Sequence, residues 1–274
     1  MSEPILPLLV EADVLQGQLG NPHLLVVDLS TAENYAKGHV AGAVYLDYPQ
    51  LVRSAKPVGG LLPDEAQLSR LLSHLGLTPD SHVVAYDDEG GGKAARLLWT
   101  LEAIGHHRYS LLNGGLHVWL NEGHPLEHKP HTPQPSDFEV QIQPHCEAVV
   151  GRQFILEHLQ DETVALLDVR SAAEFSGQKC YAERGGHIPG AINIEWTEFM
   201  DPGHNLRLKG IAELRNMLDA RAITPDKTVV VYCQTHHRSA HTWFVLKYLG
   251  YPHARGYEGS WSDWGNLSDT PIEV

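Results

Sequence analysis

The feature that most constrains this chain of 274 residues is that its two halves repeat each other. Residues 24–45 match residues 166–192 in an apolar run ending in Asp, a short amphipathic segment and a Gly-His-x-x-Gly-Ala motif. Residues 81–105, "SHVVAYDDEGGGKAARLLWTLEAIG", match residues 227–250, "KTVVVYCQTHHRSAHTWFVLKYLG". Self-similarity over such long segments indicates a tandem duplication, so both halves are expected to adopt one fold.

The repeat sets the expected domain boundaries. We predict a first domain over residues 1–124, a linker over residues 125–145 and a second domain over residues 146–274. The linker assignment follows from its composition, because a proline-rich segment favours an extended tether over packed structure. Its prolines are Pro125, Pro130, Pro133, Pro135 and Pro144.

Within each half, short apolar runs alternate with helical patterns such as residues 63–76. Strands that are apolar throughout and separated by helices indicate an α/β fold, with a parallel sheet covered by helices on both faces. Ligands of such sheets bind beyond the carboxyl ends of the strands. Cys233 directly follows the apolar run 229–232, so it is expected at such an end.

The composition excludes several classes of function. A formal net charge of −14 disfavours nucleic acid or an anionic membrane surface as a partner, because both require a basic face. No apolar run approaches the ~20 residues of a membrane span, and the N-terminus lacks the basic residues of a signal peptide. The three cysteines form no CxxC pair, which disfavours a disulfide framework. We therefore expect a cytoplasmic protein.

The loop after Cys233 favours nucleophilic chemistry. The residues "QTHHR" lead into a helical pattern with an apolar face, and a loop closing onto a helix start directs backbone N–H groups and a partial positive charge inward. Arg238 lies at the entrance of this helix, where its guanidinium can hold one wall of the loop. Such surroundings lower the pKa of a cysteine from ~8.5 towards neutrality or below. Cys233 is thus a candidate thiolate nucleophile.

Two enzyme classes place a thiolate in such a loop. Cysteine phosphatases have five residues between the cysteine and the arginine, whereas here Cys233 and Arg238 are separated by four. The shorter loop suits a thiolate that carries one extra sulfur atom. A phosphatase stays an alternative at this point.

The chain resembles the tandem-domain rhodaneses, a family of sulfurtransferases, over essentially its whole length. The resemblance rests on "GHVAGA", "GGHIPGA", "LDVRSAAEF", "CQTHHRS" and "GYEGSWSDWGN". It implies that Cys233 carries a persulfide, formed from a small sulfur donor and passed to a thiophile such as cyanide or a thiol. It also implies a catalytically silent first half, in which Asp87 takes the place of Cys233.

The loop resembles that of certain bacterial thiosulfate sulfurtransferases, so thiosulfate is the expected donor. A 3-mercaptopyruvate sulfurtransferase and a persulfide carrier or regulatory module stay open as alternatives. No cofactor is expected, and we expect a monomer because two halves packed together would bury each other's apolar surface.

The candidate site residues follow from the loop and from the resemblance. Besides the catalytic Cys233, we assign substrate binding to Gln234, Thr235, His236, His237, Arg238 and Trp196, and supporting roles to Asp168, Arg170 and Ser239. Trp196 is equally well explained as a packing residue. A metal site at the histidines is disfavoured because no carboxylate cluster is near in the sequence. Cys146 and Cys180 are expected to be bystanders.

The loop after Asp87 is expected to be unable to hold an anion. Asp88 and Glu89 fall where donors would be needed, and no arginine matches Arg238. Counted forward from Asp87, the following helical pattern resumes one residue later than in the second half, which predicts a longer first loop.

Overall fold

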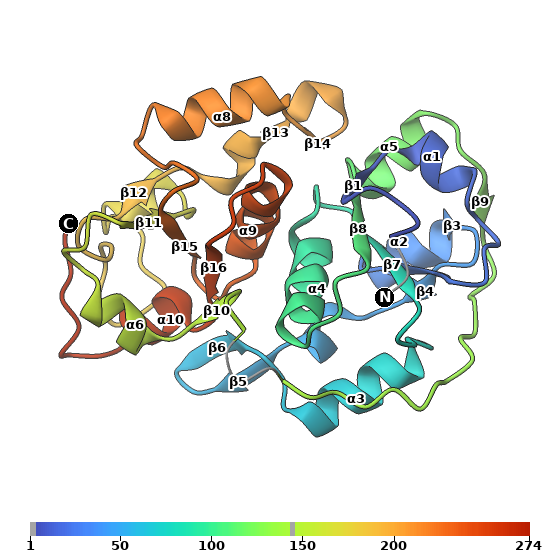
Figure 1. Cartoon of the computed structure of the whole chain (residues 1–274), viewed down its shortest axis with the longest axis horizontal. Helices are drawn as coiled ribbons and strands as arrows, with labels where there is room; N and C mark the ends of the chain where they lie inside the picture. Colours follow the sequence, from blue (N-terminus) through green and yellow to red (C-terminus); the bar gives the residue numbers. More distant parts are fainter. Residues whose placement is uncertain (1–3, 143–145) are drawn as a thin grey trace. The chain divides into compact units, whose positions relative to one another are not determined.

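The structure is a computed structural model that describes residues 4–142 and 146–274. Residues 1–3 and 143–145, at the start of the expected first domain and the end of the expected linker, lie outside the described residues. The chain divides into two compact units, each described here by itself (Figure 1). Unit 1 comprises Met1–Leu51, Pro63–Cys146 and Asp201–Leu208, and unit 2 comprises Val52–Leu62, Glu147–Met200 and Lys209–Val274.

Unit 1 is built on a five-stranded parallel sheet in the order β1-β8-β7-β2-β4. Its strands are β1 (Leu9–Val10), β8 (Tyr109–Leu112), β7 (His82–Tyr86), β2 (Leu24–Asp28) and β4 (Val44–Tyr45). The other elements are α1 (Ala12–Gln16), α2 (Ala32–Lys37), β3 (His39–Val40), η1 (Tyr48–Leu51), α3 (Glu65–His74), α4 (Gly92–Ala103), α5 (Gly115–Asn121), β9 (Leu126–Glu127), η3 (Pro202–His204) and β14 (Arg207–Leu208).

Unit 2 repeats this sheet in the order β10-β16-β15-β11-β12, again with parallel neighbours. Its strands are β10 (Val149–Val150), β16 (Ala254–Tyr257), β15 (Thr228–Tyr232), β11 (Val164–Asp168) and β12 (Ile192–Asn193). The other elements are β5 (Arg53–Ala55), β6 (Val58–Leu61), α6 (Arg152–Glu157), α7 (Ala172–Phe175), η2 (Trp196–Phe199), α8 (Ile211–Asp219), α9 (Arg238–Tyr248) and α10 (Ser260–Trp264); β13 (Met200–Asp201) spans the boundary.

The predicted α/β fold with parallel sheets is confirmed. All five residues of β7 are buried, as are the last four of β15. Successive side chains of a strand point to opposite faces, so burial of every side chain means that both faces of the sheet are covered. The central strands therefore form the cores of the two units.

A tyrosine at the end of each central strand explains the repeated Gly-His-x-x-Gly-Ala motif. The hydroxyl of Tyr86 accepts a hydrogen bond from Val40 N at 3.0 Å, and that of Tyr232 accepts one from Ile188 N at 3.1 Å. Both tyrosines are fully buried. The motif is thus fixed to the strand end that precedes Asp87 in unit 1 and Cys233 in unit 2.

Asp168 and Arg170 form a buried ion pair at the end of β11. Arg170 Nη2 lies 2.5 Å from Asp168 Oδ2, and Arg170 also donates to the carbonyl oxygen of Gly186 at 2.7 Å. The Arg170 guanidinium lies 4.4 Å from the ring centroid of Trp261. Both charges are buried, so the attraction between them must offset the free-energy cost of removing each from water.

The described part of the expected linker, residues 125–142, runs along unit 1. Strand β9 pairs antiparallel with β3, and Val140 N donates to Ser69 Oγ at 2.9 Å. Further along, Ile142 N donates to the carboxylate of Glu65. The unit that contains this segment extends to Cys146.

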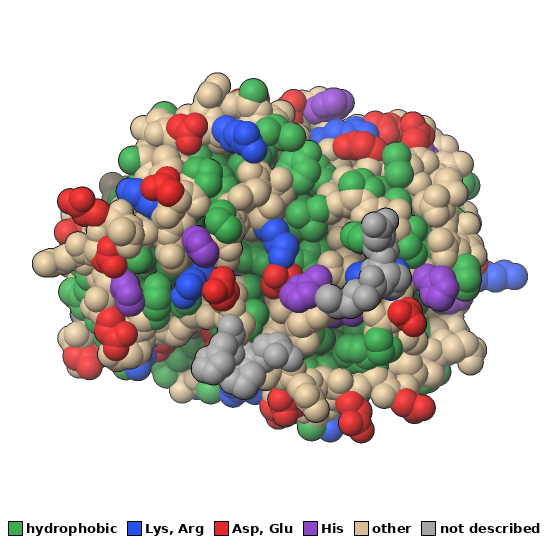
Figure 2. All heavy atoms as spheres, viewed as in Figure 1, with side chains coloured by type: hydrophobic (Ala, Val, Ile, Leu, Met, Phe, Trp, Pro, Cys, Tyr) green, Lys and Arg blue, Asp and Glu red, His purple; other side chains and the backbone are tan. Residues whose placement is uncertain are grey.

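Acidic side chains are spread over the face that Figure 2 shows, in agreement with the net charge of −14. Among the described residues, no helix has both the length and the apolar character that would be needed to cross a membrane.

Replacing Arg170 by Met should lower the free energy of unfolding of unit 2 by about 3–5 kcal/mol, because it leaves the buried Asp168 carboxylate without its countercharge. Urea denaturation of the full chain measures this change. Lys209→Met is the matched control, since Lys209 pairs at 3.0 Å with Glu213, whose side chain is 61% exposed, and its loss should cost about 0.5 kcal/mol or less. Equal, small changes for both variants would contradict the structural role of the Asp168 pair.

Candidate active site

Cys233 is the first residue beyond the carboxyl end of β15. It is only 1% exposed, so its sulfur lies at the bottom of the loop rather than on the surface. Its backbone is held on both sides, because Cys233 N donates to Ser260 Oγ at 3.3 Å and Trp261 N donates to Cys233 O at 2.9 Å. The start of α10 therefore fixes the place of the thiol.

Several donors converge on the sulfur of Cys233. The hydroxyl of Ser239 donates to Sγ at 3.4 Å, and the backbone N–H groups of Thr235 and Ser239 also donate to it. Arg238 adds a positive charge and a further hydrogen bond to the sulfur. Burial opposes ionisation of the Cys233 thiol, yet the Arg238 charge and these donors outweigh it, so the pKa of Cys233 is lowered.

The Arg238 guanidinium is itself held by a carboxylate that sequence reasoning missed. Its Nη1 and Nη2 atoms each lie 2.8 Å from an oxygen of Glu174, in a bidentate pair. Burial raises the pKa of Glu174, but Arg238 and the Ser171 hydrogen bonds outweigh it and bring it to about 2. Glu174 also closes a capping box with Ser171 at the start of α7. The "SAAE" pattern indicates that cap but not the contact with Arg238.

Two residues with left-handed backbone shape the loop. His236 has a φ of 52° and Ser260 a φ of 50°, values that non-glycine residues adopt only where surrounding contacts enforce them. Ser260 Oγ accepts from His236 N at 3.1 Å and donates to Tyr257 O at 2.8 Å. Sequence reasoning also missed Ser260. The first half has Gly115 at the equivalent position, and this difference between the repeats could have pointed to Ser260 as a residue of the site.

The four residues after Cys233 face different surroundings. Gln234 is half-buried and its Nε2 lies 3.3 Å from the carbonyl oxygen of Tyr181. Thr235 and His237 are also half-buried, whereas His236 is fully buried and its Nδ1 lies 2.7 Å from Ser239 Oγ. Of these four residues, Thr235 reaches the thiol through its backbone N–H and His236 is the most enclosed, whereas the Gln234 amide is directed to Tyr181.

Trp196 lies beside the start of α9. Its ring centroid is 6.2 Å from that of His237 and 5.5 Å from that of His241, the latter in an edge-on arrangement. Trp196 is half-buried, so one part of its ring packs and another remains accessible. Within the described ranges, no three His, Cys, Asp or Glu side chains come together in a way that could hold a metal ion.

In the part of the chain that the structure describes, the other two cysteines lie in different surroundings. Cys180 is exposed and its sulfur contacts Ala182 O at 2.9 Å. Cys146 is half-buried in unit 1, where its sulfur lies 3.7 Å from Glu102 O.

A hairpin from the first half of the sequence belongs to the same unit as the thiol. Gly59 N donates to Ser262 Oγ at 3.1 Å, and Leu62 N donates to the Glu258 carboxylate at 2.8 Å. Between these anchors, Gly60 has a φ of 73° and packs so closely on the backbone of Thr235 that a Cβ atom would overlap with the Thr235 carbonyl oxygen. The β5–β6 hairpin therefore braces the loop at a residue whose N–H donates to Cys233.

A family model of the rhodanese-like domain matches the chain twice, over residues 11–122 and 153–267. The chain belongs to the rhodanese-like family. The two matches confirm the tandem repeat, and the thiol with its loop lies in the second rhodanese-like domain.

Relatives of known name cover nearly the whole chain. It is 45% identical over 269 residues to the thiosulfate sulfurtransferase of Azotobacter vinelandii, with 98% of each chain covered. It is 30% identical over 277 residues to the 3-mercaptopyruvate sulfurtransferase of Escherichia coli, covering 96% of this chain and 97% of that relative. The crystal structure of YnjE superposes with a TM-score of 0.85 at 23% identity, covering 97% of this chain and 68% of that one.

The first rhodanese-like domain has the same loop with a carboxylate in place of the thiol. Asp87 is fully buried and accepts hydrogen bonds from the backbone N–H groups of Glu89, Gly91 and Ala94 at 2.8–3.0 Å. Backbone donors are therefore present, but burial and the Glu89 charge outweigh them and raise the pKa of Asp87, so this loop disfavours an anion, as expected from the sequence. The donors are occupied by the side chain of Asp87 itself.

The expectation of a longer first loop is wrong. Helix α4 begins at Gly92 and α9 at Arg238, in both cases at the fifth residue after the loop's first residue. The additional residue lies in the helix, since α4 has 12 residues and α9 has 11. The sequence comparison assigned the one-residue difference in length to the loop, because an additional residue inside a regular helix does not alter the sequence pattern in a way that locates it.

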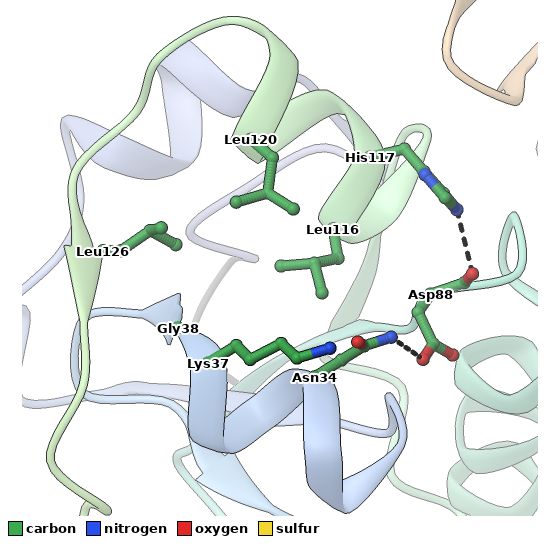
Figure 3. Close-up of a pocket in the computed structure, with 8 residues that line it drawn as sticks. All are labelled: Asn34, Lys37, Gly38, Asp88, Leu116, His117, Leu120 and Leu126. Atoms are coloured by element: carbon green, nitrogen blue, oxygen red, sulfur yellow. Dashed lines mark hydrogen bonds between the residues drawn. The ribbon is translucent and has the colours of Figure 1, made fainter.

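A pocket of about 290 Å³ opens in the first domain between α2, α5 and β9 (Figure 3). Leu116, Leu120 and Leu126 point into it, and Asp88 at its edge is hydrogen-bonded to Asn34 and to His117. In the second domain, the longer segment 177–186 covers the corresponding face of α10, where Trp261 Nε1 donates to Arg184 O at 3.1 Å. The pocket thus reflects a difference between the repeats.

Replacing Gly60 by Ala should displace the backbone of Thr235 and weaken its hydrogen bond to Cys233. Loss of one donor raises the thiol pKa, so alkylation of Cys233 by iodoacetamide at neutral pH should slow, by up to about tenfold. The measurement uses protein in which Cys146 and Cys180 are replaced by Ser. Gly250→Ala is the matched control, because Gly250 has a φ of 85° but no atom near its missing Cβ. Equal alkylation rates in the two variants would show that the hairpin does not brace the loop.

Proposed function

We propose that this protein is a sulfurtransferase that moves the outer sulfur of thiosulfate to a thiophilic acceptor through a persulfide on Cys233. The observation that carries the proposal is the buried thiol at a strand end, whose pKa is lowered by Arg238 and by donors from Thr235 and Ser239. The 45% identity to a thiosulfate sulfurtransferase over the full chain supports thiosulfate as the donor.

In the first step, the Cys233 thiolate attacks the outer sulfur of thiosulfate. The new S–S bond forms as the bond between the two thiosulfate sulfurs breaks, and the electron pair of that bond leaves with sulfite. In the second step, cyanide or a thiolate attacks the terminal sulfur of the persulfide. Cys233 is the leaving group, so the donors that stabilise its thiolate assist both steps.

Roles for the surrounding residues follow from their positions. We propose that Gln234, Thr235 and His237, whose side chains are half-buried rather than enclosed, contact the donor. Trp196, beside His237, forms a wall of the same region. Arg238 offsets the acidity of the protein locally, although Glu174 neutralises part of its charge. The Asp168–Arg170 pair supports the neighbouring strand end.

The proposed partners are small molecules: a sulfur donor, and a small thiophile or a protein thiol as acceptor. The net charge of −14 disfavours nucleic acid and anionic membranes. The sequence has three cysteines and no CxxC pair, which favours a reducing compartment, so we propose a cytoplasmic location. We also propose that the protein is a monomer and acts without a cofactor.

Steady-state assays test the proposal with three substrates: thiosulfate, 3-mercaptopyruvate and an aryl phosphate. Cyanide is the acceptor in the two assays of sulfur transfer. Thiosulfate should give the highest kcat/KM, and thiocyanate should form. A higher kcat/KM for 3-mercaptopyruvate than for thiosulfate would show that 3-mercaptopyruvate, and not thiosulfate, is the preferred donor. A single turnover without steady-state transfer would make the protein a persulfide carrier, and release of phosphate would make it a phosphatase.

Cys233→Ser should abolish thiocyanate formation from thiosulfate, because the alcohol has no comparable nucleophilic anion near neutral pH. Cys146→Ser and Cys180→Ser are the matched controls and should retain most of the activity. Full activity of the Cys233 variant would refute the assignment of the carrier.

Arg238→Ala should lower kcat/KM for thiosulfate about ten- to a hundredfold, because it removes a charge-assisted contact of about 1.5–3 kcal/mol from the thiolate. Arg221→Ala is a control, since Arg221 lies 4.0 Å from Glu198 in an exposed pair. Unchanged activity of Arg238→Ala at low ionic strength would show that the charge of Arg238 does not contribute to sulfur transfer.

A further inference from the structure

Three side chains of the active-site loop form a continuous hydrogen-bonded chain. His236 Nδ1 lies 2.7 Å from Ser239 Oγ, and Ser239 Oγ lies 3.4 Å from Cys233 Sγ. His236 and Ser239 are fully buried, and Cys233 is 1% exposed. The imidazole of His236 is therefore enclosed behind the thiol, rather than placed at the mouth of the loop where a substrate would meet it.

The backbone holds this chain in place. The left-handed conformation of His236 and its N–H bond to Ser260 Oγ turn the residue back into the loop. Ser239 lies in the first turn of α9, three residues after His236 and six after Cys233. The strained φ of His236 is the cost of this arrangement, and such strain persists only where surrounding contacts enforce it.

The first domain lacks this chain. Its equivalent positions are Gly90, which has a φ of 94°, and Lys93, which pairs with Asp88 at 3.1 Å. The Asp87 carboxylate there is held by backbone donors. A glycine is thus sufficient for the left-handed turn, so the turn itself does not require a histidine. The imidazole of His236 occurs only in the one of these two loops that holds a thiol.

The single hydroxyl proton of Ser239 can point to only one acceptor at a time. A serine in the first turn of a helix readily donates to a nearby backbone carbonyl, which would leave the sulfur without this donor. When the imidazole carries its proton on Nδ1 and donates to Ser239 Oγ, the hydroxyl proton is directed away from the ring and towards Cys233 Sγ.

We propose that His236 is a positioning residue that acts through Ser239, keeping the serine hydroxyl directed at Cys233 and so stabilising its thiolate. The inference rests on the proposed function of Cys233 and reassigns His236 from substrate binding. It applies to both steps of transfer, because the same thiolate is the nucleophile of the first and the leaving group of the second.

Other charged and titratable groups near the thiol must be kept constant in a test. Arg238 at the start of α9 acts on Cys233 directly, and Glu174 of α7 acts through Arg238. The Asp168–Arg170 pair lies at the end of the neighbouring strand β11. His237 and His241 lie on the side of α9 that meets Trp196. None of these residues is changed in the variants below.

The test measures the pH dependence of Cys233 alkylation by iodoacetamide in full-length protein with Cys146→Ser and Cys180→Ser. His236→Gly removes the ring and keeps the backbone turn, and it should raise the pKa of Cys233 by about one unit. His236→Asn suits the left-handed backbone and offers an amide N–H to Ser239, so it should restore at least half of that shift. In a Ser239→Ala background, His236→Gly should cause no further change, because the two residues act in one chain.

An unchanged pKa in His236→Gly would overturn the proposal, as would an Asn variant that behaves like the Gly variant, since the ring would then only fill space. Additive effects of His236→Gly and Ser239→Ala would also overturn it. If the Gly variant does not fold, the comparison of His236→Asn with Ser239→Ala decides: a small shift in the first and a large one in the second supports the chain, and the reverse contradicts it. Alkylation needs no sulfur transfer, so this result is independent of whether thiosulfate is the substrate.

Discussion

The stabilisation of one buried thiolate is the constraint on which the rest of the site depends. Cys233 is 1% exposed, so its thiol loses nearly all of its hydration, and this alone would raise its pKa. The Arg238 charge, the Ser239 hydroxyl and two backbone N–H groups replace the lost water. Each of these donors needs its own support, which Glu174 supplies to Arg238 and Ser260 supplies to the loop backbone.

The duplication shows what the loop does when it has no thiol. In the first rhodanese-like domain, backbone donors converge on the carboxylate of Asp87 instead. A carboxylate attached to the chain satisfies them permanently and leaves no nucleophile. The backbone donors of the loop therefore occur in both halves. The chemistry differs because the second half has a thiol in place of the Asp87 carboxylate, together with Arg238 and His236 near that thiol.

Much of the fold could be predicted from the sequence because it depends on local patterns. Strands that are apolar throughout indicated covered parallel sheets, and the position of Cys233 after such a strand placed it at a carboxyl end. The spacing between Cys233 and Arg238 indicated a short loop. The repeat and the closing "GYEGSWSDWGN" segment carried the family resemblance, which the two matches to the rhodanese-like domain confirm.

What could not be predicted comes from residues distant in the chain. Glu174 reaches Arg238 from α7, Ser260 holds the loop from the start of α10, and Gly60 packs on Thr235 from a hairpin in the first half of the sequence. Such contacts leave no periodic signal. The length of the loop after Asp87 was misjudged for a related reason, since the additional residue lies inside the regular helix α4.

The most direct test of the central claim is mass spectrometry of the protein after treatment with thiosulfate under non-reducing conditions. The account predicts one added sulfur atom per chain, located on the peptide that contains Cys233 and released by cyanide. Sulfur found on the peptide of the exposed Cys180, or no added sulfur at all, would contradict the claim that the buried thiolate is the carrier.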